Sequence, residues 1–153
     1  MTTDIETMLD AHGCDRTALL DILWDVQRCS GYIPAAAAAA IAERLGLSVE
    51  DVLETATFYH FFHTAPAGRY RIYLSNTVIA KMRGYDEVHA ALERETGARF
   101  DAPASAEFGL FETACIGVSD QEPAMLVDGV VFTDLTPASV ADIIAGLKSG
   151  KTP

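Results

Sequence analysis

The hydrophobic pattern of this chain changes its period near residue 65, and that change limits the possible folds more than any other feature. Before residue 65, apolar side chains recur at helical spacing in four stretches, separated by Gly13, Gly31 and Gly46. After the connection "HTAPAG", the stretch 69–74 alternates between two sets of side chains, which is the period of a strand. We therefore expect a helical bundle at 1–65, a second domain at 66–150, and the start of a linker or C-terminal tail at 151–153.

Local signals divide the second domain into short strands and helices. A helical stripe runs from Tyr85 to the next glycine, and Thr136 is placed to cap a last helix. Residues 108–113 have strand character, and "AMLVDGVVF" predicts a hairpin whose tight turn is Asp128-Gly129. The order strand, helix, strand, hairpin, helix favours an α/β (α+β) fold, namely a compact thioredoxin-like domain with a small mixed sheet and flanking helices.

Composition argues against polyanionic partners. Half of the residues are hydrophobic and 22% are charged, and 11 Lys and Arg against 22 Asp and Glu leave a net charge of −11. Such a charge repels phosphate backbones and anionic membranes. The longest apolar run, residues 33–42, is shorter than the roughly 20 residues that a membrane-spanning helix needs, and the acidic N-terminus has no signal-peptide core. We expect a cytoplasmic protein that binds neither nucleic acid nor membrane.

The cysteines and histidines form no recognisable metal or disulfide framework. Cys14, Cys29 and Cys115 are widely spaced and odd in number, so no CxxC pair, zinc spacing or disulfide pattern can be assembled from them. Free cysteines are usually buried, and we expect this packing role for Cys14 and Cys29. His60 and His63 have a spacing that metal sites use, but their four aromatic neighbours favour a packed helix end or a junction with the second half.

No motif of nucleotide binding or catalysis is visible. The glycines make no GxGxxG or GxxxxGK pattern, and HExxH, nucleophile-elbow and paired-carboxylate motifs are missing from the sequence. We therefore expect dispersed, solvated carboxylates and no catalytic residue. Cys115, in a loop after the second strand, stays a candidate redox or metal-binding thiol. The alternative is an inert thiol in a partly buried loop, since no histidine or lysine lies beside it in sequence to lower its pKa.

Several segments resemble one protein family over nearly the whole chain. "GYIP", "ATFYHFF", "RIYL", "CIG" and "EPAMLVDG" look like motifs of the small thioredoxin-like [2Fe-2S] subunit of respiratory complex I. A narrower resemblance is to the N-terminal domain of the diaphorase α subunit of soluble NAD-reducing nickel–iron hydrogenases, carried by "DRTALLDILWDVQ", "NTVIAKMRGY", "FGLFETACIGVSDQEPAML" and "KSGKTP". In that subunit the chain continues past the last of these segments into the flavin domain, so two alternatives stay open: a separate subunit or an excised domain.

The resemblance also implies where a cluster would be held and what stands there instead. The family holds its [2Fe-2S] cluster on a C-x4-C pair after the first strand and a C-x3-C pair after the next. Counted back from Gly84 and Pro123, these positions fall on Ser75, Ala80, Cys115 and Ser119. A [2Fe-2S] cluster needs four anionic or imidazole donors, whereas alanine supplies none and a neutral hydroxyl substitutes poorly for thiolate sulfur. We therefore expect a vestigial site, no cofactor or metal in this chain, and no electron transfer through this domain.

The function implied by the resemblance is that of an accessory domain in the NADH-oxidising (diaphorase) module of an NAD-reducing hydrogenase. The chain would then be part of an NAD-dependent oxidoreductase of the hydrogen dehydrogenase type. FMN, NAD, the working iron–sulfur clusters and the nickel–iron centre would lie elsewhere in the complex, and the partners would be the flavin-binding diaphorase domain and the iron–sulfur subunits. Two alternatives stay open: the same module in an NAD-dependent formate dehydrogenase or complex I-like enzyme, and a small redox or metal-binding protein that uses Cys115.

Five aromatic side chains of the helical half are candidates for the partner surface. Four of them are Phe58, Tyr59, Phe61 and Phe62, and on a continuing helix Tyr59 would turn away from the other three. One small bundle can bury the shared side, which leaves aromatic surface for a neighbour, together with Trp24. The alternative is that these aromatics form the junction between the two halves of the chain.

Overall fold

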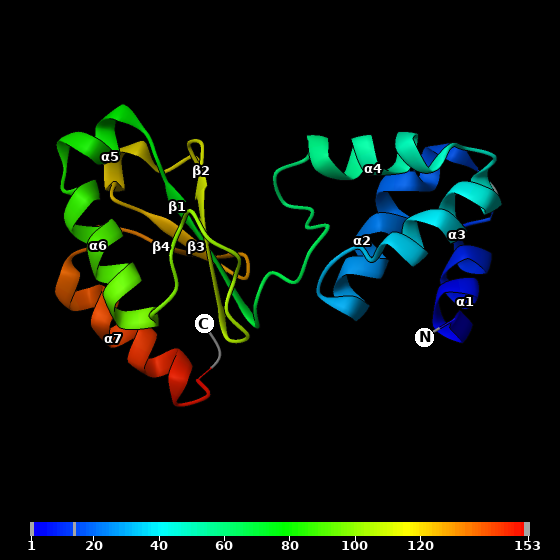
Figure 1. The fold of residues 1–153 in the computed structure, drawn as a ribbon. Coiled ribbons are helices and arrows are strands. Elements are labelled where there is room, and N and C mark those ends of the chain that lie inside the picture. Colours follow the sequence, from blue (N-terminus) through cyan, green and yellow to red (C-terminus); the bar gives the residue numbers. More distant parts are fainter. Residues whose placement is uncertain (1, 14, 152–153) are drawn as a thin grey trace. The chain divides into compact units, whose positions relative to one another are not determined.

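The computed structural model describes residues 2–13 and 15–151, with side chains from residue 5 onward. The chain divides into two compact units, Met1–Pro66 and Ala67–Pro153, which we call the helical unit and the sheet unit (Figure 1). Each unit has a hydrophobic core of its own. Within the described ranges, no helix is long and apolar enough to cross a membrane.

The helices of the helical unit are separated at Gly13, Gly31 and Gly46, as the sequence predicts. Its helices are α1 (Thr2–His12), α2 (Leu19–Ser30), α3 (Ala35–Leu45) and α4 (Val49–Phe58), with a 3₁₀ turn, η1 (Arg16–Ala18), before α2. Ser48 and Asp51 form a capping box at the start of α4. Pro34 lies one residue outside α3, as its extended N-cap.

The last helix of this unit ends earlier than the sequence pattern predicts. α4 stops at Phe58, because Tyr59 adopts an extended backbone and residues 59–63 fold into a turn. The buried side chain of Gln27 in α2 holds this turn: its amide nitrogen donates to the carbonyl oxygen of Phe61 at 2.8 Å, and its Oε1 accepts from the backbone N–H of His63 at 2.7 Å. These tertiary hydrogen bonds replace the helical ones, so the predicted helical face of residues 58–62 does not form.

The sheet unit is built on one four-stranded mixed sheet in the order β2-β1-β3-β4. β1 (Tyr70–Ser75) runs parallel to β2 (Phe108–Thr113) and antiparallel to β3 (Met125–Val127), which pairs with β4 (Val130–Phe132). β3 and β4 form the predicted hairpin, and its turn residues Asp128 and Gly129 both have positive φ, as a primed two-residue turn requires. The α/β class with a small mixed sheet, expected from the sequence, is confirmed.

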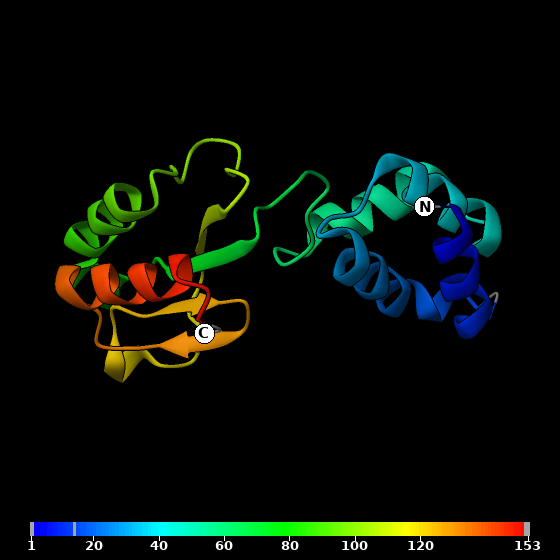
Figure 2. The same ribbon diagram turned by 90° about the horizontal axis from the view of Figure 1, so that it is seen from below.

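Helices connect the strands and cover one face of this sheet. Between β1 and β2 lie α5 (Val78–Met82) and α6 (Tyr85–Thr96), while η2 (Ser119–Gln121) precedes β3 and α7 (Pro137–Lys148) follows β4. α6 and α7 lie side by side on the sheet, as both views show (Figures 1 and 2). α5 is a separate short helix that the sequence analysis did not distinguish, because Gly84, with φ of 99°, breaks the chain direction between α5 and α6.

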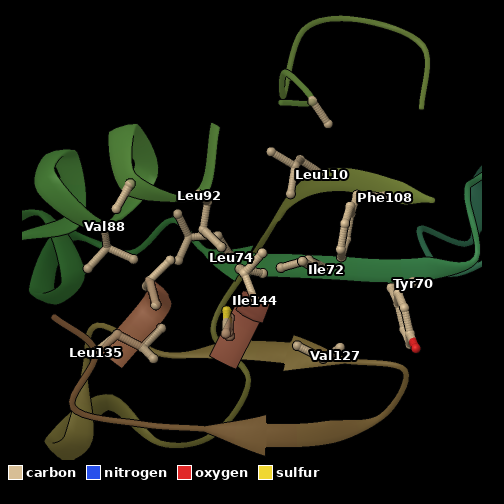
Figure 3. Packing of buried hydrophobic residues seen from close by; sticks show 14 of the residues in the cluster. Tyr70, Ile72, Leu74, Val88, Leu92, Phe108, Leu110, Val127, Leu135 and Ile144 are labelled. Atoms are coloured by element: carbon tan, nitrogen blue, oxygen red, sulfur yellow. The ribbon is translucent and has the colours of Figure 1, made fainter. Parts of the chain in front are cut away.

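Side chains along β1 alternate between the two faces of the sheet, and the buried set shows which face packs against the helices. Ile72 and Leu74 are fully buried, whereas Arg71 and Tyr73, which point to the opposite face, are only half-buried. Figure 3 shows Leu74 near Leu92 of α6 and Ile144 of α7. Burial of each such large apolar side chain stabilises the fold by about 1.5–3 kcal/mol. The sheet unit is therefore held by a core between one sheet face and two helices.

A close backbone approach between β2 and the segment before β1 gives a test of this packing. A Cβ on Gly109 would lie 2.2 Å from the carbonyl oxygen of Ala67. Because the clash is with backbone, we expect Gly109→Ala to lower the free energy of unfolding of the sheet unit by at least about 1–3 kcal/mol. Chemical denaturation followed by circular dichroism measures this change.

The matched control is Gly146→Ala in α7. The nearest atom to the added Cβ would be a side-chain carbon of Lys151 at 3.9 Å, which is an ordinary contact. Alanine is favoured over glycine in a helix interior, so this variant should be as stable as the parent or more stable, by up to about 1 kcal/mol. Equal losses of stability in the two variants would contradict the packing described for Gly109.

Candidate functional site

The first predicted ligand pair lies at the turn between β1 and α5. Ser75 is the last residue of β1 and is fully buried, and its hydroxyl donates to Oε1 of Glu122 at 2.6 Å. Ala80 is fully buried in α5 and belongs to the hydrophobic core of the sheet unit. One of these positions is therefore committed to a hydrogen bond, and the other offers only a methyl group.

Glu122 collects the hydrogen bonds at this turn, and only 2% of the residue is exposed. Its Oε1 accepts from the hydroxyls of Ser75 and Thr77, at 2.6 and 3.3 Å. Its Oε2 accepts from the backbone N–H of Ala124 at 2.9 Å. Thr77 also caps α5, because its Oγ1 accepts from the N–H of Ala80 at 3.0 Å. Three donors thus satisfy a carboxyl group that would otherwise be costly to bury.

Sequence reasoning missed this carboxyl group. The expectation that the carboxylates lie on solvated faces is wrong for Glu122, which is buried between the turn after β1 and the segment before β3. The available signal was its position beside Pro123, directly ahead of the apolar stretch that forms β3. An acidic residue at the entry to a buried strand needs donors nearby, and the hydroxyls of "SNT" at the end of β1 supply them.

The second predicted pair, Cys115 and Ser119, lies in the segment after β2. The Cys115 Sγ is 3.2 Å from the Ser119 Oγ and accepts from the backbone N–H of Gly117 at 3.3 Å. These hydrogen bonds, the Ser119 one first, lower the pKa of the Cys115 thiol. The thiol itself is exposed, while Ile116, Val118 and Ser119 of the same loop are half-buried. A hydroxyl and a backbone N–H lower its pKa in the absence of an adjacent histidine or lysine in the sequence.

Hydrogen bonds tie these two segments to each other through Glu122 and Arg83. The Arg83 guanidinium, just after α5, donates through Nη1 to the carbonyl oxygens of Asp120 and Glu122 at 2.6 and 3.4 Å. In the part of the chain that the structure describes, no hydrogen bond joins either Ser75 or Ala80 to Cys115 or Ser119. The hydrogen bonds therefore pair Ser75 with Glu122 and Cys115 with Ser119.

A second polar group lies beside the same turn, and the sequence analysis did not single it out. Asn76 donates through Nδ2 to Oε2 of Glu112 at 2.6 Å, and the Tyr85 hydroxyl donates to Oε1 of the same carboxyl group. Burial and, after it, the bond to Glu112 raise the pKa of Tyr85 well above its usual value, while the Tyr85 hydroxyl lowers the pKa of Glu112. This arrangement keeps Glu112 ionised and Tyr85 protonated near neutral pH, so it fastens the start of α6 to the end of β2.

The remaining candidate metal ligands are not assembled into a site. Among the described residues, no group of three or more His, Cys, Asp or Glu side chains is placed to hold a metal ion. His60 and His63 lie in the turn after α4, so the helical face that would align them does not exist. Cys29 is exposed, and the packing role expected for it is wrong. Cys14 lies outside the described residues.

The five candidate interface residues gather in the helical unit as one aromatic cluster, made of Trp24, Phe58, Tyr59, Phe61 and Phe62. The Trp24 ring stacks on Phe61, with centroids 5.0 Å apart, and meets Phe62 edge-on at 5.2 Å. Phe62 is buried in the core, whereas Phe58 is 80% exposed. The predicted sharing of one helical side by the three phenylalanines is therefore wrong, and the exposed part of the cluster consists mainly of Trp24, Phe58 and Phe61.

Comparison with known proteins assigns the family. The family model described as thioredoxin-like [2Fe-2S] ferredoxin matches residues 5–148, which include most of both units. The chain belongs to this family. The thioredoxin-like resemblance noted in the sequence is thereby confirmed, and the α/β architecture agrees with it.

Two relatives and one solved structure are similar to most of this chain. The chain is 56% identical over 154 residues to the NAD-reducing hydrogenase HoxS subunit alpha of Cupriavidus necator, an alignment that covers 100% of this chain and 26% of that subunit. It is 33% identical over 138 residues to a subunit of the NADH-quinone oxidoreductase of Escherichia coli (strain K12), covering 87% of this chain and 81% of that subunit. The crystal structure of an NAD⁺-reducing [NiFe]-hydrogenase in the H₂-reduced state superposes with a TM-score of 0.73 at 27% identity, over 89% of this chain and 23% of that one. This chain thus spans about a quarter of the hydrogenase subunit that it resembles.

The donors at the four predicted positions do not fit the cluster after which the family is named. Cysteine thiolates hold [2Fe-2S] clusters, with histidine as the known substitute at some sites. Here the positions offer one thiol, two hydroxyls and a methyl group. The Ser75 hydroxyl donates to Glu122, and the Ala80 methyl group packs in the core. We derive no electron-transfer step through this site.

The hydrogen bonds to Cys115 predict a measurable reactivity. Thiolate, and not thiol, is the nucleophile, so a lowered pKa lets alkylation of Cys115 begin at lower pH than alkylation of an ordinary cysteine. Ser119→Ala removes the hydroxyl that contributes most to this shift, and the curve of alkylation rate against pH should move to higher pH. Iodoacetamide labelling followed by mass spectrometry, with Cys14 and Cys29 replaced by serine, measures the rate at Cys115 alone.

The control for this experiment is Ser149→Ala, which removes an exposed hydroxyl that bonds Gly146 and not the thiol. Its alkylation curve should coincide with that of the parent. An unmoved curve in Ser119→Ala would show that the Cys115–Ser119 contact does not influence the thiol in solution.

Proposed function

We propose that this chain is an accessory domain of the NADH-oxidising (diaphorase) module of an NAD-reducing hydrogenase, that it holds no redox cofactor, and that it docks on the flavin-carrying part. One observation carries the cofactor-free part of this proposal: the Ser75 hydroxyl is committed to Glu122 and the Ala80 position ends in a methyl group inside the core. The likeness to the HoxS alpha subunit, which extends over this whole chain, supports the choice of a hydrogenase.

The rest of the complex supplies the chemistry in this proposal. FMN, NAD, the working iron–sulfur clusters and the nickel–iron centre belong to neighbouring domains or subunits, and the flavin-binding domain and the iron–sulfur subunits are the partners. The cytoplasmic location expected from the sequence is part of the same proposal. The second candidate is the equivalent place in a complex I-like enzyme, which the 33% identity to the NADH-quinone oxidoreductase protein of Escherichia coli favours.

Iron analysis tests the cofactor-free part directly. After anaerobic purification we expect the chain to contain no iron and no acid-labile sulfide, because only one of the four predicted positions can supply a thiolate. Elemental analysis, sulfide determination and the visible absorption spectrum are the measurements. A thioredoxin-like [2Fe-2S] ferredoxin with all four cysteines, purified in parallel, is the control. Stoichiometric iron with the absorption of a [2Fe-2S] cluster in the present chain would refute the proposal.

The aromatic cluster is the surface that we propose for docking. Phe58, Phe61 and Trp24 are 80%, 39% and 36% exposed, and the buried Phe62 packs against the rings of Trp24 and Phe61. Phe58 packs edge-on against Tyr59. Aromatic side chains held rigidly at a surface are the anchors that protein interfaces favour, since they bury a large area at little cost in conformational entropy. The alternative, that the sheet unit covers this cluster, leads to a different outcome in the following test.

Phe58→Ala separates the two possibilities. The side chain is mostly exposed, so its truncation should leave the midpoint of thermal unfolding of the isolated chain unchanged. We expect the dissociation constant for the flavin-carrying part, produced as a separate chain, to rise by at least about tenfold, which is the loss of one interface anchor. Isothermal titration calorimetry measures the constant.

Met82→Ala is the matched control, because Met82 is 81% exposed, is similar in size, and lies in the sheet unit. It should leave the dissociation constant unchanged. If Phe58→Ala destabilises the isolated chain without weakening the association, the aromatic cluster serves the junction between the units. If both variants weaken the association equally, the effect is not specific to the aromatic cluster, and the proposal that this cluster is the docking surface fails.

A further inference from the structure

The two segments that carry the predicted ligand pairs are joined by a buried carboxyl group. Ser75 is the last residue of β1 and Thr77 lies in the turn that follows, whereas Glu122 lies in the segment that begins with Cys115 and leads into β3. The hydrogen bonds from these two hydroxyls to Oε1 of Glu122 cross from one segment to the other, over 47 and 45 residues of sequence. Both partners in the shorter bond are inaccessible, with Ser75 at 0% and Glu122 at 2% exposure.

A metal cluster held by a pair of ligands from each segment would cross-link the same two segments. We propose that Glu122 replaces this cross-link with protein atoms alone, so that the turn after β1 and the segment 115–122 are held together without iron. This inference rests on the cofactor-free part of the proposed function and adds the group that takes over the structural role.

The hydrogen-bond geometry is that of a carboxyl group used as an acceptor on both oxygens. Oε1 receives two hydroxyl donors and Oε2 receives the N–H of Ala124, itself a fully buried residue. Removal of the carboxyl group would leave the Ser75 hydroxyl and the Ala124 N–H buried without these partners, which is more costly than the loss of an exposed bond. Arg83 adds two further bonds between the segments, but both end on backbone carbonyl oxygens.

The same geometry opposes a cluster at this place. A cysteine at position 75 would put its sulfur beside Oε1 of Glu122, where the Ser75 oxygen now lies at 2.6 Å. A thiolate ligand and a carboxylate are both anionic, and two like charges at such a distance in a buried site repel each other strongly. Glu122 and a ligand thiolate at position 75 are therefore alternatives. The buried carboxyl group explains how the turn keeps its shape where the ligands do not fit.

Glu122→Gln tests the inference in the full chain. The substitution preserves the size of the side chain, but an amide has one acceptor oxygen, so its NH₂ group must face either the hydroxyls or the Ala124 N–H. We expect the midpoint of thermal unfolding to fall by about 4–8 °C, as the loss of a buried hydrogen-bond network in a domain of this size implies. Hydrogen–deuterium exchange should become faster in residues 76–84 and 115–122 in particular.

Asp120→Asn is the matched control, with the same change of charge two residues away on an exposed side chain. It should leave both the unfolding midpoint and the local exchange as in the parent. Ser75→Ala is the milder variant, which removes the shortest of the cross-segment bonds, and it should raise exchange in the same two segments. In the double variant Ser75→Ala with Glu122→Gln, the falls in the midpoint should be less than additive, because the two residues share a bond.

Each outcome has a separate meaning for the two proposals. Suppose that the protein is iron-free and that Glu122→Gln has the same unfolding midpoint and hydrogen–deuterium exchange as Asp120→Asn. The cross-link proposal is then wrong, and the cofactor-free function stands. Unchanged hydrogen–deuterium exchange in Ser75→Ala would also overturn the cross-link and leave the cofactor-free function standing. This second test applies even if Glu122→Gln yields no folded protein. Cluster-containing protein would instead refute the proposed function, whatever the variants show. Iron-free protein with faster exchange confined to the two segments in both variants supports the cross-link.

Discussion

The hydrogen bonding of buried polar side chains is the constraint on which the irregular segments of both units depend. In the helical unit, Gln27 holds the turn after α4, and in the sheet unit, Glu122 holds the turn after β1. Each residue is 2% exposed, and the bonds in question join residues 34–47 positions apart in sequence. A buried amide or carboxyl group without partners is costly, so each one organises the backbone and hydroxyl groups around it. The two segments thus take their shape from tertiary contacts.

The end of β1 shows how this constraint acts on the candidate site. Alternation places Ser75 on the sheet face opposite Leu74, and that face is only half-buried at Arg71 and Tyr73. Ser75 is nevertheless fully buried, because the segment before β3 lies against the strand end: the Ser75 N–H donates to the carbonyl oxygen of Ala124, and its hydroxyl donates to Glu122. A hydroxyl enclosed in this way is a structural group. The predicted ligand position 75 is thus occupied by a buried, hydrogen-bonded serine.

The features that the sequence predicted well are those that depend on short stretches of chain. The capping residue Thr136 located the last helix, and the Asp128-Gly129 pair located the hairpin, since each signal acts within a few residues. The failures involve distant partners. Residues 59–63 leave the helix because Gln27 binds their backbone, and Glu122 is buried because hydroxyls from another segment reach it. The exposure of Cys115 likewise depends on how its loop lies in the fold, which local patterns do not encode.

The two proposals assign a different role to each unit: docking to the helical unit, and an iron-free cross-link to the sheet unit. A domain that carries electrons needs ligands for a cofactor, whereas a domain that only supports a neighbour needs a stable fold and a rigid surface. The sheet unit offers donors that do not fit a cluster but has a buried carboxyl group that can hold the same two segments together. The helical unit offers exposed aromatic rings, two of which pack against a buried one. Neither the buried carboxyl group nor the aromatic surface requires a metal ion. The proposed docking is therefore compatible with the proposed absence of a cluster, and the two proposals can be tested independently in separate units.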